Sequence, residues 1–364
     1  MLLIEPRVGE GQPQAPSSAA YLPSLQAEPR AGAFRKLVTS TYDVHNLCNL
    51  RCEGCSYFVS DREETTRSPD PEAYAEFFAA EAARGVTYPI FTGAEPSLNQ
   101  GPLRIAAQYW RYGAIFTNGV KRIDPALPFR VVISLWGGRR SNQRLRGANS
   151  YEKALRAAAG DKRAIVFFTV TGKSIDDIPE VIADCAAIGV KVSFNFYSMT
   201  GEYVRRLQSS APNDKTFYRF SSSADNLALD ASGRARAAEL IERGLRDFPG
   251  TVLFSPLLSQ IMAGEGPMHP IDPSTGLAIG CAVLDAKNHV SFNHDLTRDS
   301  RKDCTAPDLD CRDCRVVGAA LATSITRRAR VMRSSPAAAA EMRELRELMM
   351  KLYYWDWEPP SNPA

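Results

Sequence analysis

Apolar and polar positions along the chain follow a strand-then-helix order that begins near residue 37. Short runs rich in β-branched and aromatic residues predict strands at 37–44, 89–92, 114–117, 130–135, 164–170 and 190–197. The stretches between them predict helices at 71–84, 102–112, 151–159 and 175–188. Pro71 suits a helical first turn, and Gly85 suits a helix end. This alternation predicts parallel βαβ units, whose chemistry lies at the carboxyl ends of the strands.

The pattern changes after about residue 200. Residues 201–230 are polar and irregular, and further helices are predicted at 231–247, 316–333 and 336–353, with a hairpin at 277–293 turning near 285–288. Residues 1–35 are rich in Pro, Ala, Gln and Ser without an apolar period, which predicts a mobile N-terminal arm. We therefore predict an α/β chain with a partial (β/α)6 TIM-like barrel at 36–230, a small cysteine-rich domain at 231–325, and a C-terminal helix and tail at 326–364.

Composition excludes several classes of function. The 364 residues carry a net charge of only +3, so no large basic surface indicates a nucleic-acid partner. No apolar run reaches the 18 or more residues that a membrane span needs. The N-terminus lacks the basic start and apolar core of a secretory signal, so we expect a cytoplasmic protein without a membrane partner.

The cysteines provide the strongest chemical signal. Three of the eight lie in the string C-N-L-R-C-E-G-C as Cys48, Cys52 and Cys55, directly after the first predicted strand. Three thiolates at this spacing can hold one face of a [4Fe–4S] cluster and leave one iron open for catalysis. A structural zinc site would need a fourth ligand, for which His45 is the candidate. Cys185 lies alone in an apolar helix and is predicted to pack in the core.

Further motifs follow the later strands in order. Gly93-Ala94-Glu95-Pro96 follows the second strand, Thr117-Asn118-Gly119 ends the third, and Ile133-Ser134-Leu135-Trp136-Gly137 ends the fourth. Together with the cysteine string, this series resembles the radical S-adenosylmethionine (SAM) superfamily. The following residues 142–155 resemble the subgroup with SPASM or Twitch extensions. The resemblance covers about residues 36–320.

The resemblance implies how SAM is bound beside a catalytic [4Fe–4S] cluster. It implies that the segment from Gly93 to Pro96 contacts the SAM amino group, with Glu95 accepting a charge-assisted hydrogen bond. Asn118 and Ser134 are candidate ribose contacts, and Asn195 ends the sixth strand where it can face SAM. Gly54 stands where the family usually has an aromatic residue near the adenine. Tyr57 or Phe58 is the candidate replacement.

Basic residues crowd the segment after the fourth strand, which we predict to be a loop. They are Arg139, Arg140, Arg144 and Arg146. Such a cluster either clamps a phosphate or carboxylate, with Arg146 as a candidate SAM contact, or forms a solvated surface loop.

A second group, Cys281, Cys304, Cys311 and Cys314, has the spacing C-x22-C-x6-C-x2-C. Four thiolates in one region indicate a closed metal site, for which iron–sulfur and zinc are both compatible. The resemblance favours an auxiliary [4Fe–4S] cluster of the Twitch type, which would transfer electrons rather than bind substrate.

The function that the resemblance implies is reductive cleavage of SAM to a 5′-deoxyadenosyl radical, which abstracts a hydrogen atom from substrate. A flavodoxin- or ferredoxin-type protein would donate the electron. We expect a small-molecule substrate in natural-product or cofactor biosynthesis, because residues 1–35 are too short for a folded leader-binding domain. The alternatives are a maturase that cross-links side chains of a ribosomal peptide and, in a different class, a zinc-binding structural or interaction protein.

Overall fold

The computed structural model describes residues 37–57, 67–147, 149–208, 221–286, 289–299, 304 and 308–357. The chain divides into two compact units, Met1–Arg35 and Lys36–Ala364, and the description below concerns the second. The predicted N-terminal arm at 1–35 lies outside the described residues. No boundary inside the second unit is tested, so the divisions at 230 and 325 stay predictions.

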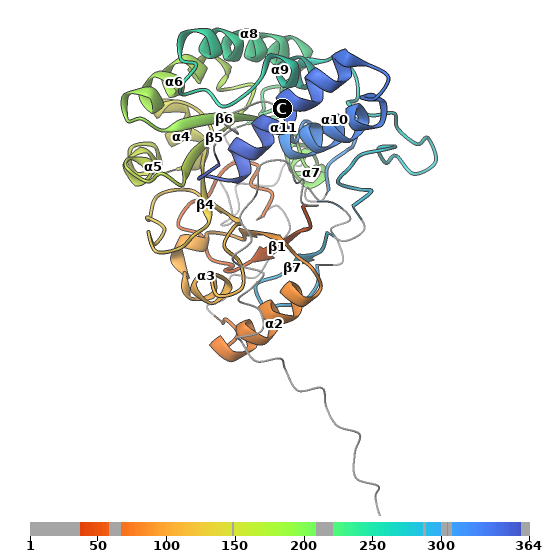
Figure 1. The fold of residues 1–364 in the computed structure, drawn as a ribbon. Coiled ribbons are helices and arrows are strands. Elements are labelled where there is room, and N and C mark those ends of the chain that lie inside the picture. The colour runs from red at the N-terminus through yellow and green to blue at the C-terminus, as the bar shows by residue number, and fades with distance from the viewer. Residues whose placement is uncertain are drawn as a thin grey trace, which may run out of the picture. The chain divides into compact units, whose positions relative to one another are not determined.

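A parallel sheet forms the centre of this unit (Figure 1). Its strands are β1 (Thr39–Asp43), β2 (Tyr88–Thr92), β3 (Ala114–Thr117), β4 (Arg130–Leu135), β5 (Ala164–Val170), β6 (Lys191–Phe196) and β7 (Ser291–Phe292). The spatial order is β6-β5-β4-β3-β2-β1-β7, and every neighbouring pair is parallel. The first six strands follow chain order, as a partial (β/α)6 barrel requires. The predicted fold class is therefore confirmed.

Helices connect the strands and continue after them. Between the strands lie α2 (Pro71–Ala83), η2 (Pro96–Leu98), α3 (Gly101–Ala106), α4 (Arg139–Arg146), α5 (Ser150–Ala158), η3 (Ile175–Asp177) and α6 (Ile178–Ala187). After β6 come α7 (Gly201–Gln208), α8 (Ala231–Asp247), α9 (Pro256–Ala263), α10 (Val317–Val331) and α11 (Pro336–Tyr353). Helix α8 packs against α9, and α10 packs along α11 (Figure 1).

Alternation along the strands separates a packed face from a partly open one. In β5, Val166, Phe168 and Val170 are fully buried, whereas Phe167 and Thr169 between them are only half-buried. Successive strand side chains point to opposite faces, so the buried set faces the helices and the other set faces the barrel interior. Phe116 of β3 lies on the interior face and remains 37% exposed.

Four local predictions were wrong. The region 201–230, predicted to be irregular, begins with the helix α7, whose buried Tyr203 and Leu207 dock it. The arginine-rich segment after β4 is the helix α4 rather than a loop, although it lacks a broad apolar stripe; its few buried side chains, including Leu145, suffice to dock it. Helix α3 ends at Ala106, because the following residues form turns. The predicted hairpin is replaced, among its described residues, by turns before residue 287 and by β7. Strand β7 joins β1 in parallel, and Phe292 stacks on Tyr42 with ring centroids 5.7 Å apart.

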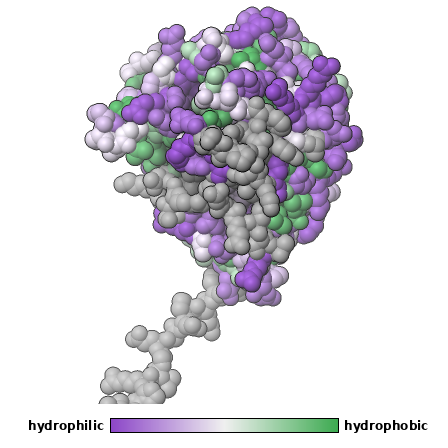
Figure 2. Space-filling model, turned by 180° about the vertical axis from the view of Figure 1, so that it is seen from behind, coloured by the Kyte–Doolittle hydropathy of each residue, from purple (hydrophilic) through white to green (hydrophobic). Residues whose placement is uncertain are grey.

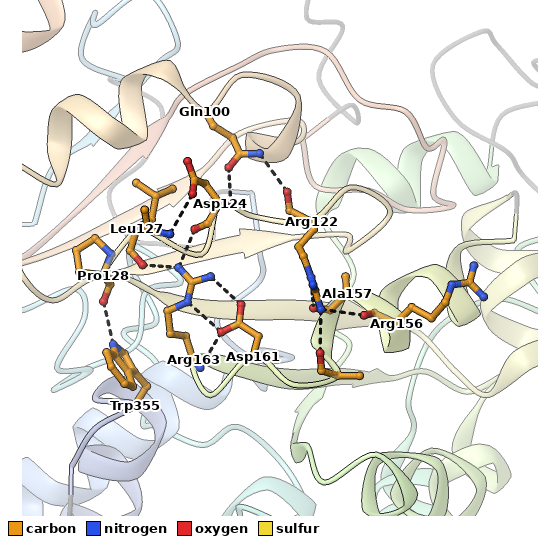
Figure 3. A network of polar contacts seen from close by, with 12 residues as sticks. Gln100, Arg122, Asp124, Leu127, Pro128, Arg156, Ala157, Asp161, Arg163 and Trp355 are labelled. Atoms are coloured by element: carbon orange, nitrogen blue, oxygen red, sulfur yellow. Dashed lines mark hydrogen bonds and ion pairs between the residues drawn. The ribbon is translucent and has the colours of Figure 1, made fainter.

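A polar network closes the amino ends of the strands (Figure 3). Arg163, just before β5, binds both carboxylate oxygens of Asp161 at 3.0 and 2.7 Å and also donates to the carbonyls of Asp124 and Leu127. The indole of Trp355 donates to the carbonyl of Pro128 at 2.9 Å. Trp355 thus docks the segment after α11 against the barrel, at the end opposite the carboxyl ends of the strands.

Among the described residues, no helix combines the length and apolarity needed to cross a membrane. On the face in Figure 2 the described surface is mostly hydrophilic, with small separate hydrophobic areas.

Candidate functional site

The cysteine loop begins at the carboxyl end of β1 and is fastened to the end of β2. The amide of Val44 donates to the Thr92 carbonyl at 3.2 Å, and the amide of Ala94 donates to the His45 carbonyl at 2.9 Å. Gly93 has φ +114°, and a Cβ there would lie 2.6 Å from the His45 carbonyl oxygen. Only glycine fits at this position, which explains why the loop after β2 can approach the cysteine loop so closely.

Nitrogen donors are directed at two of the three sulfurs. The Leu50 amide lies 3.4 Å from Cys48 Sγ, Asn118 Nδ2 lies 3.7 Å from the same sulfur, and Arg146 Nε lies 3.3 Å from Cys52 Sγ. Such donors stabilise thiolates and tune the potential of iron–sulfur clusters, so the donor set fits a cluster. Burial, reinforced by the charge of Cys52, raises the pKa of Cys48 to about 12. Metal binding there would therefore release a proton.

No group of three histidine, cysteine, aspartate or glutamate side chains in the described part of the chain has the arrangement of a metal site. Both predicted ligand sets therefore stay predictions.

Glu95 lies beneath the loop and joins the ends of β2 and β3. It is 1% exposed, and its carboxylate accepts hydrogen bonds from the amide of Ser97 at 2.9 Å, the hydroxyl of Thr117 at 2.5 Å and the amide of Asn118 at 2.8 Å. Asn118 in turn donates to the side chain of Asn49 in the cysteine loop at 2.7 Å. The structure thus brings Glu95, Asn118 and Cys48 together, as their positions after successive strands predicted.

Arg146, at the end of α4, is the arginine of its helix that enters the site. It is 6% exposed, contacts Cys52 as described, donates to the Ser134 carbonyl, and lies 5.8 Å from the ring centroid of Trp136. Arg139 instead binds Glu152 on the surface. The predicted basic cluster is therefore divided, because these two residues stand about 10 Å apart along a helix rather than in one loop.

Tyr197, which follows β6, fills the space beside Gly54. Gly54 has φ +63°, and a Cβ on it would lie 2.2 Å from the Tyr197 hydroxyl. That hydroxyl donates to the Gly54 carbonyl at 3.1 Å. The ring of Tyr197 thus occupies the space that a side chain at position 54 would fill. Tyr57 is half-buried in the same loop, and the other candidate, Phe58, lies outside the described residues.

Sequence reasoning missed Glu53 and Tyr203. Glu53 lies between Cys52 and Cys55, is 0% exposed, and accepts hydrogen bonds from the Tyr203 hydroxyl at 2.8 Å and the Ser221 amide at 3.1 Å. Its other carboxylate oxygen has no hydrogen-bond partner among the described residues. A carboxylate inside a cysteine string was the available signal, but nothing in the sequence indicated its partner.

The second cysteine group is gathered near α10. Cys281 is buried and Cys304, Cys311 and Cys314 are half-buried. Burial, together with smaller contributions from the charges of Cys304, Cys281 and Cys311, raises the pKa of Cys314 to about 11, so the four thiols are electrostatic neighbours. Asn195 faces this region: its Oδ1 accepts from the Val317 amide at 3.0 Å. Its predicted contact with SAM stays a prediction.

Comparisons with known proteins address the fold. No protein-family model and no curated protein matches the chain. Streptococcus suis SuiB, solved with the precursor peptide SuiA, aligns with a TM-score of 0.50 at 14% identity, over 71% of this chain and 57% of SuiB. The chain therefore shares the fold of SuiB over the aligned region. The protein anSMEcpe, solved with bound AdoMet, aligns over 77% of both chains at 14% identity with a TM-score of 0.49. The alignment with SuiB covers less than three fifths of the length of SuiB.

Proposed function

We propose that this protein is a radical SAM enzyme whose catalytic [4Fe–4S] cluster is held by Cys48, Cys52 and Cys55. The observation that carries the proposal is the set of nitrogen donors on Cys48 and Cys52, at the carboxyl end of β1 in a radical SAM fold. When bound, the cluster and SAM would supply a 5′-deoxyadenosyl radical that abstracts a hydrogen atom from substrate.

The residues around the cysteine loop have the charges that SAM needs. Glu95 is a buried acceptor for the ammonium of SAM, presented by the backbone of Gly93, Ala94 and Pro96. Arg146, which contacts Cys52, is a buried donor for the SAM carboxylate. These two charges orient the amino-acid end of SAM toward the loop. Asn118, Ser134 and Asn195 remain our candidates for the ribose, and Tyr57 or Phe58 for the adenine.

We assign Cys281, Cys304, Cys311 and Cys314 to an auxiliary [4Fe–4S] cluster of the Twitch type. Four thiolates leave no open coordination position, which suits electron transfer. A flavodoxin- or ferredoxin-type protein is the proposed electron donor.

For the substrate, our first candidate is a small molecule bound on the interior face of the barrel. Phe116 is 37% exposed there, and its ring meets that of half-buried Phe167 edge to face, with centroids 6.4 Å apart. These rings would receive an apolar part of the substrate. The second candidate is a peptide, and it is favoured by the complex of SuiB with its precursor peptide.

Anaerobic reconstitution with iron and sulfide, followed by incubation with SAM and a chemical reductant, tests the function. We expect iron and sulfide in equal amounts and formation of 5′-deoxyadenosine. Deuterium that passes from a labelled substrate into 5′-deoxyadenosine would identify the carbon attacked. Protein that binds only zinc and leaves SAM intact would instead support a zinc-binding structural or interaction protein.

A further inference from the structure

We propose that Tyr197 and Tyr203 are positioning residues that couple the two cysteine groups. Both belong to residues 195–203, from the end of β6 into α7, which we call the connector. One side of the connector holds the arm between Cys52 and Cys55, and the other side holds the polypeptide around Cys311 and Cys314. The proposal rests on the proposed function only in treating both cysteine groups as cluster sites.

On the first side, two tyrosines bind the arm between Cys52 and Cys55. The Tyr197 hydroxyl donates to the Gly54 carbonyl at 3.1 Å, and the Tyr203 hydroxyl donates to Glu53 Oε1 at 2.8 Å. The two rings also contact each other edge to face, with centroids 6.2 Å apart. Tyr203 is 0% exposed and Tyr197 is 9% exposed, so neither ring can move without displacing packed neighbours. The positions of Glu53 and Gly54 therefore depend on the position of the connector.

On the second side, the connector binds the stretch that carries Cys311 and Cys314. The Ser198 hydroxyl accepts from the Arg315 amide at 2.8 Å. The amides of Gly201 and Glu202 donate to the carbonyl and the carboxylate of Asp308, both at 2.7 Å. Thr200 also forms an antiparallel bridge with Leu309. Both ends of the 308–315 stretch are therefore fastened to the connector.

These contacts alternate within a short piece of backbone. Tyr197 and Ser198 are adjacent, yet Tyr197 binds the arm between Cys52 and Cys55 and Ser198 binds the 308–315 stretch. In the same way, Tyr203 binds that arm and Glu202 binds the 308–315 stretch. We expect a displacement of the 308–315 stretch to be transmitted to the tyrosine hydroxyls, because both rings are buried and cannot reorient without displacing packed neighbours. Order imposed at either cysteine group stabilises the other, since a coupling free energy acts in both directions.

Hydrogen exchange in the metal-free, full-length protein measures this coupling without any cluster. The reporters are the amides of Glu53 and Cys55, which donate to the carbonyls of Leu145 and Cys52 at 2.8 and 3.3 Å. The Asp308→Ala substitution removes the carboxylate that binds the connector. We expect it to speed exchange of both reporters about fivefold, the effect of losing roughly one hydrogen bond. In a Tyr197→Phe/Tyr203→Phe background, which keeps the rings, adding Asp308→Ala should speed it no further.

Tyr151→Phe is the matched control. Tyr151 is also buried and donates to a carboxylate, Asp184, at 2.9 Å, but it lies in α5 away from the connector. In that background Asp308→Ala should keep its full effect on the reporters. Equal effects of Asp308→Ala in the wild-type and double-phenylalanine backgrounds, or no effect in either, would overturn the proposal. Should the double variant fail to fold, Tyr203→Phe alone must at least halve the effect.

The iron-loaded protein provides the second readout. With the Cys311→Ser/Cys314→Ser substitutions, we expect the electron paramagnetic resonance (EPR) signal of the reduced first cluster to change shape in the wild-type background. The change should be lost in the double-phenylalanine background. An unchanged signal in the wild-type background would contradict the proposal. If no iron binds at all, the proposed function fails, whereas the exchange experiment still decides whether the connector couples the two groups.

Discussion

Buried charged side chains have different partners at the two ends of the barrel. At the amino ends of the strands, Arg163 faces the carboxylate of Asp161 in an ion pair of 2.7 Å, with side chains only 6% and 12% exposed. At the carboxyl ends, Glu53 is fully buried and receives hydrogen bonds from neutral donors, while Arg146 donates to a sulfur and a carbonyl.

This difference separates stability from function. A buried ion pair with saturated hydrogen bonds is costly to break, and its arrangement leaves nothing for a ligand. Buried charges without an opposite partner lower stability, and proteins retain them chiefly where a ligand or cofactor completes the arrangement. The network at the amino ends of the strands thus stabilises the barrel. The side chains at the carboxyl ends are arranged for the proposed cluster and SAM.

The largest expected effect is at the carboxyl end. Cys52→Ser should abolish iron binding at the first site and all detectable SAM cleavage, because three thiolates are the minimum for the cluster. The free energy of unfolding of the metal-free protein should change by no more than about 1 kcal/mol. Cys185→Ala, in the buried face of α6, is the control that should keep full iron content. Retention of first-site iron by Cys52→Ser would contradict the ligand assignment.

Arg163→Ala should produce the largest loss of stability, about 3 kcal/mol in urea unfolding, because it leaves the Asp161 carboxylate and the carbonyls of Asp124 and Leu127 without their donor. Iron uptake well below the unfolding midpoint should be unchanged. Arg104 contacts Asp124 with a side chain that is 60% exposed, so Arg104→Ala should cost only about 0.5 kcal/mol. Similar losses for the two variants would show that the network does not close the amino end.

Glu53→Gln tests the unpaired charge directly. It keeps an oxygen for Tyr203 and removes the buried charge, so the free energy of unfolding should stay constant or rise by about 1 kcal/mol. Glu81 is the matched carboxylate: it is 5% exposed but paired with Arg84 at 2.7 Å. Glu81→Gln should therefore lower stability by about 2 kcal/mol. The comparison of the two ends fails if both substitutions destabilise equally.

The smallest expected effect is a pH dependence. Burial alone would raise the pKa of Asp161, but the hydrogen bonds and charge of Arg163 outweigh it and hold the pKa below its usual value. A carboxyl group with a lowered folded pKa stabilises the protein above its unfolded pKa, about 3.9, and loses this contribution as pH falls through the folded pKa. Asp161→Asn should therefore cost about 1 kcal/mol at pH 7, and this cost should shrink as the pH falls through the lowered folded pKa. A cost that is constant with pH would exclude the ion pair as its source.

Much of the fold was predictable because the strands are buried on at least one face and read as β-branched runs. Strands 114–117, 130–135 and 164–170 and helices 231–247 and 336–353 have the predicted bounds. Helix α4 was missed because most of its residues are polar, and its few buried side chains, such as Leu145, are recognisable only in the folded chain.

The part of the site formed by residues that directly follow a strand was predictable from the sequence. Glu95, Asn118 and Cys48 follow successive strands, and parallel strands place their carboxyl ends together. The contacts of Glu53 with Tyr203 and of Gly54 with Tyr197 join residues 150 and 143 positions apart. No short sequence pattern predicts such pairs, because the positions of Tyr197 and Tyr203 depend on where β6 ends in the folded chain.

The most direct test of the central claim is the EPR spectrum of the reduced, iron-loaded Cys311→Ser/Cys314→Ser variant, which should retain only the first cluster. Because one iron of a three-cysteine cluster is open, adding SAM should shift the g values of this spectrum, and 5′-deoxyadenosine should follow. A signal that SAM leaves unchanged, in protein shown to carry the first cluster, would contradict the account.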